Sequence, residues 1–393
     1  LPHDRDVSAG YAGAAPAGAG RTDLHPDTPM HTSVALDFFL PGQTVRSLTP
    51  LGEGNINHTW LVVPDRGEPV VLQRLHPQVF ADPRAVMANM RLVTRHLAAA
   101  DPPITFRLCT SPDGADCFVD AAGCCWRLLS RIGPARTLAP PLSAPQVRAI
   151  GGLLGRFHHL VADLDPLTLA DPLPDFHITP RYLAHYDALG PMRPPRNELE
   201  RLCADTIESH RSAAGSLEAA RDRLRQQVIH GDPKSANVLF AAGENRAIAL
   251  IDLDTVKPGL LLHDLGDCLR SCCNRLGEDG EEGEGELFAA ELFQALLAGY
   301  RDAAGDLLGM ADRALLVESV RLISYELGLR FFTDHLAGDR YFTVTRPAQN
   351  LHRAAVQFRL HASILRQQEP LEERLAHLFA RTRPPCNCPR RGL

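Results

Sequence analysis

The sequence lacks the features that would mark a membrane-spanning, secreted or nucleic-acid-binding protein. No apolar run approaches the roughly 18 residues of a membrane-spanning helix. The first residues show no charged segment followed by an apolar one, as a secretory signal would. The formal net charge of -6 provides no basic excess to release counterions from phosphates. We therefore expect neither a membrane nor a nucleic acid as a partner.

Cysteine spacing of the kind that holds a structural zinc ion is also missing. Ten cysteines are present, but none forms a pair of Cys-x-x-Cys motifs. Cys124 and Cys125 are adjacent, as are Cys272 and Cys273, and the chain is much longer than small disulfide-bonded scaffolds. We predict reduced cysteines in a cytoplasmic protein.

Length and composition are those of a two-lobed enzyme. The 393 residues are 45% hydrophobic and 22% charged, which is ordinary for a globular protein. Residues 1–33 are rich in Ala, Gly and Pro without apolar periodicity, so we predict that they are disordered. We assign residues 36–133 to an N-terminal lobe, 134–383 to a C-terminal lobe and 384–393 to a tail.

Apolar patterns differ between the two proposed lobes. Short β-branched and apolar runs predict strands at 44–51, 59–63 and 69–75 and in further segments up to residue 130. One helix, Ala81–Leu97, with Asp82 as its N-cap, interrupts them. Beyond residue 140 the 3.6-residue period predicts mainly helices, around 144–160, 197–225, 287–302, 312–337 and 349–367. Strands followed by helices predict an α+β fold with a small β-rich lobe and a larger helical lobe. The acidic stretch 277–286 is typical of a solvated loop.

The segment HGDPKSAN contains the strongest chemical pattern of the sequence. Asp232 and Asn237 lie five residues apart, as do the Asp and Asn of a kinase catalytic loop. Phosphoryl transfer needs a carboxylate facing the attacking hydroxyl and an amide oxygen that holds Mg²⁺. Lys234 can place its ammonium against the transferred phosphoryl oxygens. We predict Asp232 and Lys234 as catalytic residues and Asn237 as a metal ligand.

A second carboxylate completes the predicted metal site. Asp252 ends the apolar run 247–251, fifteen residues after Asn237. A hard cation that bridges the phosphates of ATP prefers oxygen ligands such as these two side chains. The sequence therefore predicts ATP and Mg²⁺ as cofactors.

Nucleotide-binding residues are expected between the first predicted strands. Gly52, Gly54 and Asn55 lie in a loop whose glycines would let backbone N–H groups approach phosphates. The predicted strand 69–75 contains Gln73 and Arg74 where kinases normally have lysine. We include both as nucleotide-binding candidates.

Because the usual lysine is replaced, the sequence does not identify the residue that contacts the α- and β-phosphates. The helix that follows, 83–97, contains no acidic residue that could pair with a lysine. Gln73 can instead form a neutral hydrogen bond with Asn89, while Arg74 points to the opposite face of the strand.

These segments resemble the aminoglycoside phosphotransferase and choline kinase superfamily. The resemblance is carried by HGDPKSANVLF and IDLDTVKPGLLLHDLGDCLRS and covers roughly 45–365. GEGNINHTW, LQRLHPQVFADPRAVMANM and LRFFTDHLAGDRYF are most similar to N-acetylhexosamine 1-kinases. The resemblance implies a bilobal protein-kinase-like fold. It also implies ATP- and Mg²⁺-dependent phosphorylation of a sugar at its anomeric hydroxyl.

The same resemblance implies roles for further residues. It makes Asp232 the base and suggests that Asp264 steadies the catalytic loop. Arg330, on an otherwise apolar helix, would be costly to bury unpaired, so it either pairs structurally or hydrogen-bonds the acceptor. Arg270 has the same two alternatives, and Asp254 can face metal or substrate or cap a helix. We take Arg330, Asp254 and Arg270 as substrate candidates.

Two other functions remain open at this point. An aminoglycoside, choline or other amino-alcohol kinase would need an acidic wall for its cationic acceptor. The arginines near the presumed site disfavour this alternative, while the acidic stretch 277–286 favours it. A non-catalytic pseudokinase that only binds nucleotide is disfavoured by the intact set of Asp232, Asn237 and Asp252.

Overall fold

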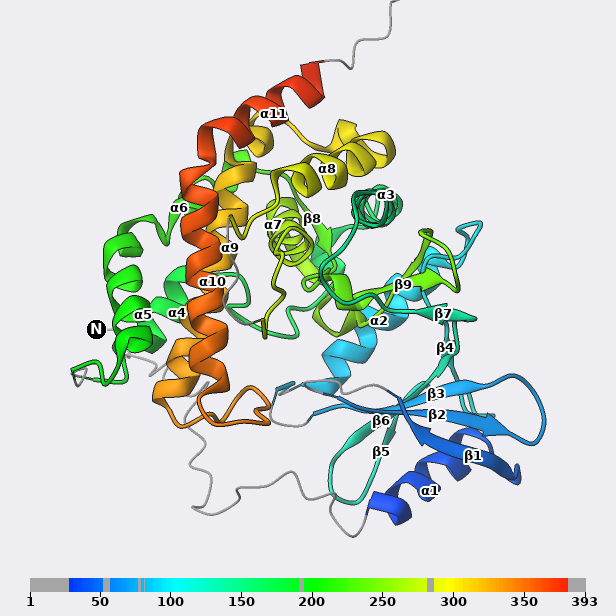
Figure 1. The fold of residues 1–393 in the computed structure, drawn as a ribbon. Coiled ribbons are helices and arrows are strands. Elements are labelled where there is room, and N and C mark those ends of the chain that lie inside the picture. The colour runs from blue at the N-terminus through cyan, green and yellow to red at the C-terminus, as the bar shows by residue number, and fades with distance from the viewer. Residues whose placement is uncertain are drawn as a thin grey trace, which may run out of the picture.

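Two regions of different architecture make up the molecule (Figure 1). A computed structural model describes residues 28–51, 57–76, 79–80, 82–190, 194–280 and 286–380. An antiparallel sheet occupies the region up to Ser130, and helices dominate from Ala144 onward. The predicted α+β fold, with a small sheet region and a larger helical region, is confirmed.

The sheet has six strands, of which five follow the order β1-β2-β3-β6-β4 while β5 also pairs with β6. Their bounds are Val45–Pro50 (β1), His58–Pro64 (β2), Val70–Arg74 (β3), Leu108–Cys109 (β4), Phe118–Val119 (β5) and Cys125–Ser130 (β6). In this register Thr59 lies opposite Gln73, and Gln73 lies opposite Arg127. Three neighbouring strands therefore place polar side chains in one row across the sheet.

A helix that the sequence did not predict covers one face of the sheet. Helix α1 (Thr28–Phe39) contributes Leu36 and Phe39 to a buried cluster with Trp60 and Trp126. The prediction of disorder is therefore wrong for residues 28–33, which are helical. Burial against the sheet, which the composition of the segment does not reveal, stabilises this helix. Residues 1–27 and 381–393 lie outside the described part of the chain.

Helix α2 (Pro83–Leu97) lies beside the sheet and begins as its sequence indicates. The carboxylate of Asp82 accepts hydrogen bonds from the backbone N–H groups of Arg84 and Ala85, at 3.0 and 3.2 Å. These bonds satisfy two of the N–H groups that every helix start leaves without a partner. The predicted N-cap is confirmed.

The helical region contains nine α-helices in its described part. They are α3 (Ala144–Leu160), α4 (Thr179–Asp187), α5 (Glu198–His210), α6 (Ser216–Ala219), α7 (Leu261–Cys272), α8 (Ala290–Ala304), α9 (Met310–Leu336), α10 (Gln349–Arg366) and α11 (Gln368–Ala380). The single helix predicted over 197–225 is wrong. After α5 the chain makes short turns around Gly215, whose low helix propensity the periodicity did not weigh.

Two small sheets lie within this region and hold the loops of interest. One contains β7 (Ala135–Arg136), β9 (Val238–Ala241) and β10 (Ala247–Leu250). The other pairs β8 (Gln226–Ile229) with β11 (Lys257–Leu260). The turns after β8 and β10 emerge close to each other, since His230 Nε2 lies 3.1 Å from the carbonyl oxygen of Ile251.

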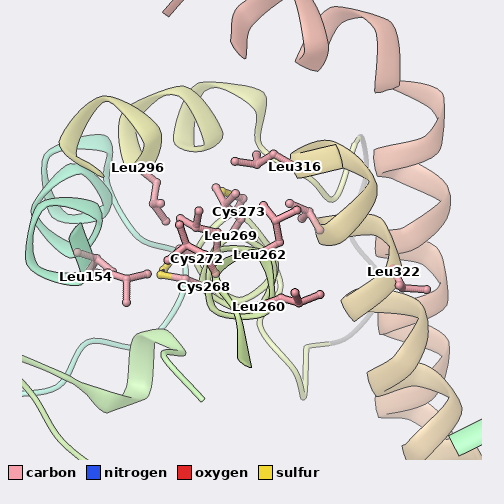
Figure 2. Packing of buried hydrophobic residues seen from close by; sticks show 14 of the residues in the cluster. Leu154, Leu260, Leu262, Cys268, Leu269, Cys272, Cys273, Leu296, Leu316 and Leu322 are labelled. Carbon is pink, nitrogen blue, oxygen red and sulfur yellow. The ribbon is translucent and has the colours of Figure 1, made fainter. Parts of the chain in front are cut away.

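Helix α7 lies at the centre of the hydrophobic core (Figure 2). Its Leu269 and Cys268 pack among Leu154 of α3, Leu296 of α8 and Leu316 of α9. Because α7 is buried along its length, its polar side chains must find partners inside the protein. None of the helices in the described ranges is long and apolar enough to cross a membrane.

Candidate active site

The loop between β8 and β9 brings three predicted residues together. The amide nitrogen of Asn237 donates to the backbone carbonyl of Asp232 at 2.8 Å and to its Oδ2 at 3.1 Å. Lys234 Nζ donates to the same Oδ2 at 2.7 Å. The side chains of Lys234 and Asp232 are 28% and 23% exposed, so a small molecule can reach both.

The charges of this loop favour an ionised carboxylate. Burial alone would raise the pKa of Asp232, but the neighbouring ammonium of Lys234 lowers it below its ordinary value. The pKa of Lys234 is raised: burial would lower it, but Asp232 and then Glu278 outweigh that effect. Asp232 is therefore a carboxylate that can accept a proton, next to a permanent positive charge.

The turn after β10 places Asp252 beside this loop. The backbone N–H of Ile251 donates to the Asn237 carbonyl at 2.9 Å, and Asp252 adopts a left-handed backbone conformation with φ of 65°. Burial, followed by the charges of Asp254 and Asp232, raises the pKa of Asp252 to about 7. A cation would relieve this repulsion between carboxylates.

Asn237 and Asp252 fit a magnesium ion that also takes ligands from phosphates. The amide nitrogen of Asn237 is engaged by Asp232, which leaves its oxygen for a cation. Among the described residues, no group of three or more His, Cys, Asp or Glu side chains could hold a metal ion by itself. Mg²⁺ usually keeps one or two protein ligands and completes its shell with phosphate and water oxygens.

Asp264 on α7 anchors the start of the catalytic loop. Its carboxylate accepts hydrogen bonds from the backbone N–H groups of His230 at 2.7 Å and Gly231 at 2.8 Å, and from His158 Nε2 at 2.8 Å. Asp264 and the His158 side chain are fully buried. The expectation that Asp264 steadies the loop agrees with these contacts.

Gly231 sets how closely the two loops approach. Its φ is 89°, and a Cβ atom at this position would lie 2.4 Å from the carbonyl oxygen of Thr255. On either side of it, Thr255 Oγ1 donates to the His230 carbonyl at 2.9 Å, and His230 Nε2 donates to the Ile251 carbonyl at 3.1 Å. Only glycine combines this backbone conformation with this contact.

The sequence did not identify His177 and Glu326 as part of this site. His177 Nε2 donates to the Gly231 carbonyl at 2.7 Å, and its Nδ1 lies 3.2 Å from Glu326 Oε1. Burial would lower the pKa of His177, but the hydrogen bond to Glu326 and its charge outweigh this and raise it. The two residues lie 149 positions apart, so no local pattern indicates the pair.

Gln73 does not meet Asn89, so that prediction is wrong. Asn89 donates to the carbonyls of Ala170 and Val256, at 2.8 and 2.9 Å. Gln73 Oε1 instead accepts two hydrogen bonds from Arg127, at 2.9 and 2.7 Å. No local pattern connects Arg127 with this position, because the contact depends on strand order. Arg74, on the opposite face as expected, lies 5.7 Å from the Trp126 ring centroid.

Asp254 is engaged inside the protein. It forms an ion pair with Arg127 and accepts a hydrogen bond of 2.5 Å from Asn57. Its side chain is only 2% exposed, so the structure does not support the expectation that Asp254 faces the substrate. The other nucleotide-binding candidates, Gly52, Gly54 and Asn55, lie outside the described residues.

Arg270 is also engaged by its own chain. Its side chain, 2% exposed, pairs with Asp267 at 2.8 Å and with Glu278 at 3.2 Å. Both partners would have to be displaced before Arg270 reached an acceptor, which favours the structural alternative for this residue.

The acidic stretch forms ion pairs at both of its described ends. Glu278 pairs with Arg270, and Glu286 pairs with Arg366 at 2.9 Å. Asp279 pairs with Arg353 at 2.7 Å. The side chains of Glu278, Asp279 and Glu286 are still 31%, 50% and 47% exposed, so both described ends are in contact with solvent while they form these ion pairs.

Arg330 lies in a cluster of aromatic rings on α9 and its neighbours. Its guanidinium carbon lies 5.0 Å from the ring centroids of Phe176 and Tyr182, 5.9 Å from that of Tyr341 and 5.5 Å from that of Phe342. Such rings attract cations through their faces. A cation of the protein itself therefore occupies this aromatic cluster.

Known proteins share this fold. The sequence profile described as "Phosphotransferase enzyme family" matches residues 47–307. A microcompartment-associated aminopropanol kinase superposes with a TM-score of 0.61 at 18% identity, over 88% of this chain and 99% of its own. The choline kinase LicA from Streptococcus pneumoniae gives 0.55 at 15% identity, over 86% and 99%. The amicoumacin kinase hAmiN in complex with AMP-PNP, Ca²⁺ and Ami gives 0.57 at 15% identity, over 89% and 93%.

Proposed function

The chain belongs to the phosphotransferase enzyme family, and from this premise we propose that it is an ATP- and Mg²⁺-dependent sugar 1-kinase. Its acceptor is the anomeric hydroxyl of an N-acetylhexosamine or a related hexose. The observation that supports the chemistry best is the partly exposed, ionised carboxylate of Asp232, held beside Lys234 and Asn237.

Asp232 acts on the acceptor hydroxyl. One carboxylate oxygen orients the hydroxyl and takes its proton while the hydroxyl oxygen bonds to the γ-phosphorus and the bond to the leaving ADP oxygen breaks. Lys234, 2.7 Å from Asp232, offsets the charge of the transferred group. Since this transition state needs little covalent assistance, positioning provides most of the rate.

Asn237 and Asp252 are the residues that would hold Mg²⁺. When bound, the ion neutralises charge on the nucleotide phosphates. The first lobe would bind the nucleotide, with Gly52, Gly54 and Asn55 as its candidate residues. Gln73 is engaged by Arg127 and Thr59, and Arg74 lies on the other face of the strand, near Trp126. We assign residues up to 133 to this lobe and residues 134–383 to the catalytic and substrate lobe.

Charge on the acceptor side supports a neutral acceptor. Arg330 already supplies the positive charge that its four surrounding rings attract, and a cationic acceptor would be repelled there. In the proposed complex Arg330 hydrogen-bonds a sugar oxygen. The sugar itself is inferred from the resemblance of IDLDTVKPG and its flanking segments to N-acetylhexosamine 1-kinases.

One observation favours an amino-alcohol acceptor instead. Glu278 brings a carboxylate close enough to Lys234 to raise its pKa, and a carboxylate would attract a cationic acceptor. Because this carboxylate is paired with Arg270, we rank the alternative second.

An acceptor panel tests the proposal. ADP release is measured with ATP, Mg²⁺ and each of N-acetylglucosamine, N-acetylgalactosamine, glucose, galactose, choline and kanamycin. We expect release with an N-acetylhexosamine and none with its methyl glycoside, the matched control, which lacks a free anomeric hydroxyl. Release with choline or kanamycin alone would establish the alternative. Absence of release with every acceptor would favour a non-catalytic nucleotide-binding protein.

A further inference from the structure

A row of polar side chains connects the first sheet to the metal loop, which we define as residues 251–255. Gln73 Nε2 donates to Thr59 Oγ1 at 3.1 Å, and Gln73 Oε1 accepts from Arg127 Nε and Nη2. Arg127 Nη1 then donates to Asp254 in the metal loop. The row crosses β2, β3 and β6 and ends two residues after Asp252.

The ion pair in this row is buried. Arg127 is 0% exposed and Asp254 is 2% exposed. Arginine keeps its proton under all ordinary conditions. The planar guanidinium spans Gln73 and Asp254, a geometry that a lysine at position 73 would not reproduce. Arg127 thus provides, from the neighbouring strand β6, the positive charge that Gln73 in β3 does not have.

The other oxygen of Asp254 is also tied to the first lobe. Asn57 Nδ2 donates to Asp254 Oδ2 at 2.5 Å, and Asn57 Oδ1 accepts from the backbone N–H of His76 at 3.1 Å. Both oxygens of Asp254 are therefore held by residues of the sheet region.

This tether bears on Asp252 because that residue is held in a strained conformation. A non-glycine residue with φ of 65° persists only where its surroundings over-determine the backbone. The turn Leu253–Thr255 follows directly, and Asp254 is its central residue. Fixing Asp254 therefore fixes the direction of the Asp252 carboxylate.

We propose that Arg127 is a positioning residue that holds the metal loop through Asp254, and so aims Asp252 at the metal ion of the bound nucleotide. This inference rests on the proposed function, since it assumes a magnesium–nucleotide complex between the sheet and Asp252. Gln73 serves as the neutral clamp that orients the guanidinium. Arg127 itself touches neither substrate nor nucleotide.

The experiment measures how strongly Mg²⁺ is required by the full chain and by R127M and D254N. Calorimetric titration with ADP at a series of Mg²⁺ concentrations reports binding, and ADP release reports turnover. Loss of a partner behind a metal ligand typically costs about 10–100-fold in metal affinity, so each variant should raise the half-saturating Mg²⁺ concentration by that factor. The KM for the acceptor should stay within about twofold, because the row does not reach the acceptor side.

The double variant and a matched control sharpen the result. The half-saturating Mg²⁺ concentration of R127M/D254N should be no higher than that of either single variant, because both residues belong to one interaction. The control is R91M, which removes another arginine–carboxylate pair of the first lobe, between Arg91 and Asp116. It should leave the Mg²⁺ requirement unchanged.

Several outcomes would overturn the inference. A folded R127M protein with the wild-type Mg²⁺ requirement would do so, as would a variant that loses stability without a shift in that requirement. If circular dichroism shows that R127M does not fold, the double variant R127M/D254N, which buries neither charge, must still require more Mg²⁺ than the wild type. A wild-type chain that binds Mg²⁺–ADP but phosphorylates no acceptor contradicts the proposed function alone. A wild-type chain that binds no Mg²⁺–ADP contradicts both.

Discussion

The two sides of the candidate site are built in different ways. On the reaction side, loop 230–237 and the metal loop 251–255 are joined by short backbone and side-chain hydrogen bonds. On the acceptor side, Arg330 is surrounded by rings from residues 176–182 and 341–342, distant in sequence. The proposed reaction residues are thus held by local contacts, whereas the proposed acceptor residue Arg330 lies among rings from separate segments. Changes on the two sides should have different consequences.

The largest effect is expected at Asp232. Replacing the carboxylate in D232N removes the proton acceptor but keeps the shape, so kcat should fall about 10²–10⁴-fold. Calorimetry should show nearly unchanged ATP binding. Turnover like that of the wild type would remove Asp232 from the reaction side.

A large effect on both stability and turnover is expected at Asp264. In D264N the amide nitrogen faces N–H donors that Asp264 now accepts, and each unsatisfied donor costs about 1–3 kcal/mol of unfolding free energy. The free energy of unfolding, measured with denaturant, and kcat should both decrease. The matched control is D312N, because Asp312 is also buried and accepts hydrogen bonds from the backbone N–H groups of Arg225 and Gly309, away from the loop. That variant should lose stability and retain kcat per folded molecule, and an equal loss of kcat would refute the anchoring role of Asp264.

A smaller and more selective effect is expected at Arg330. Loss of a charged hydrogen bond to the acceptor costs about 1.5–3 kcal/mol, so R330Q should lower kcat/KM for the acceptor by about 10–100-fold. The KM for ATP should not change. The control R181Q removes an exposed arginine of α4, the helix that also contains Tyr182. Equal effects of R330Q and R181Q would show that Arg330 is not an acceptor residue.

The smallest expected effect is a pH dependence at His177. Since the folded-state pKa of His177 is raised, its protonated form stabilises the fold fully below pH 6.5, and the contribution disappears as pH rises through the folded-state value. The groups facing it are Glu326 of α9, His263 and Asp267 of α7, and the Gly231 carbonyl. The stability difference between wild type and H177Q, from denaturant unfolding at pH 5.5 to 8.5, should shrink with rising pH. A constant difference would contradict a charged His177.

The sequence predicted those parts of the site whose partners are near in the chain. Asp232, Lys234 and Asn237 share one loop, and their spacing alone indicated their proximity. The contact of Asp254 could not be predicted, because burial pairs it with Arg127, 127 positions away.

The fold divides in the same way. Helix α2 was predicted because Asp82 and the apolar period are local signals. Helix α1 was missed because a sheet formed by later residues stabilises it. The break after α5 was missed because periodicity continues through the turns around Gly215.

Gly231 has a consequence for how such an enzyme can change. Its backbone is in van der Waals contact with Thr255. The distance between the loop that contains Asp232 and the metal loop is therefore the smallest that two peptide backbones allow. In a saturation library at position 231 we expect glycine alone to survive selection for turnover. In libraries at the residues around Arg330 we expect many variants to remain active. Variants with new acceptors can therefore arise there while the distance between Asp232 and the metal loop stays unchanged.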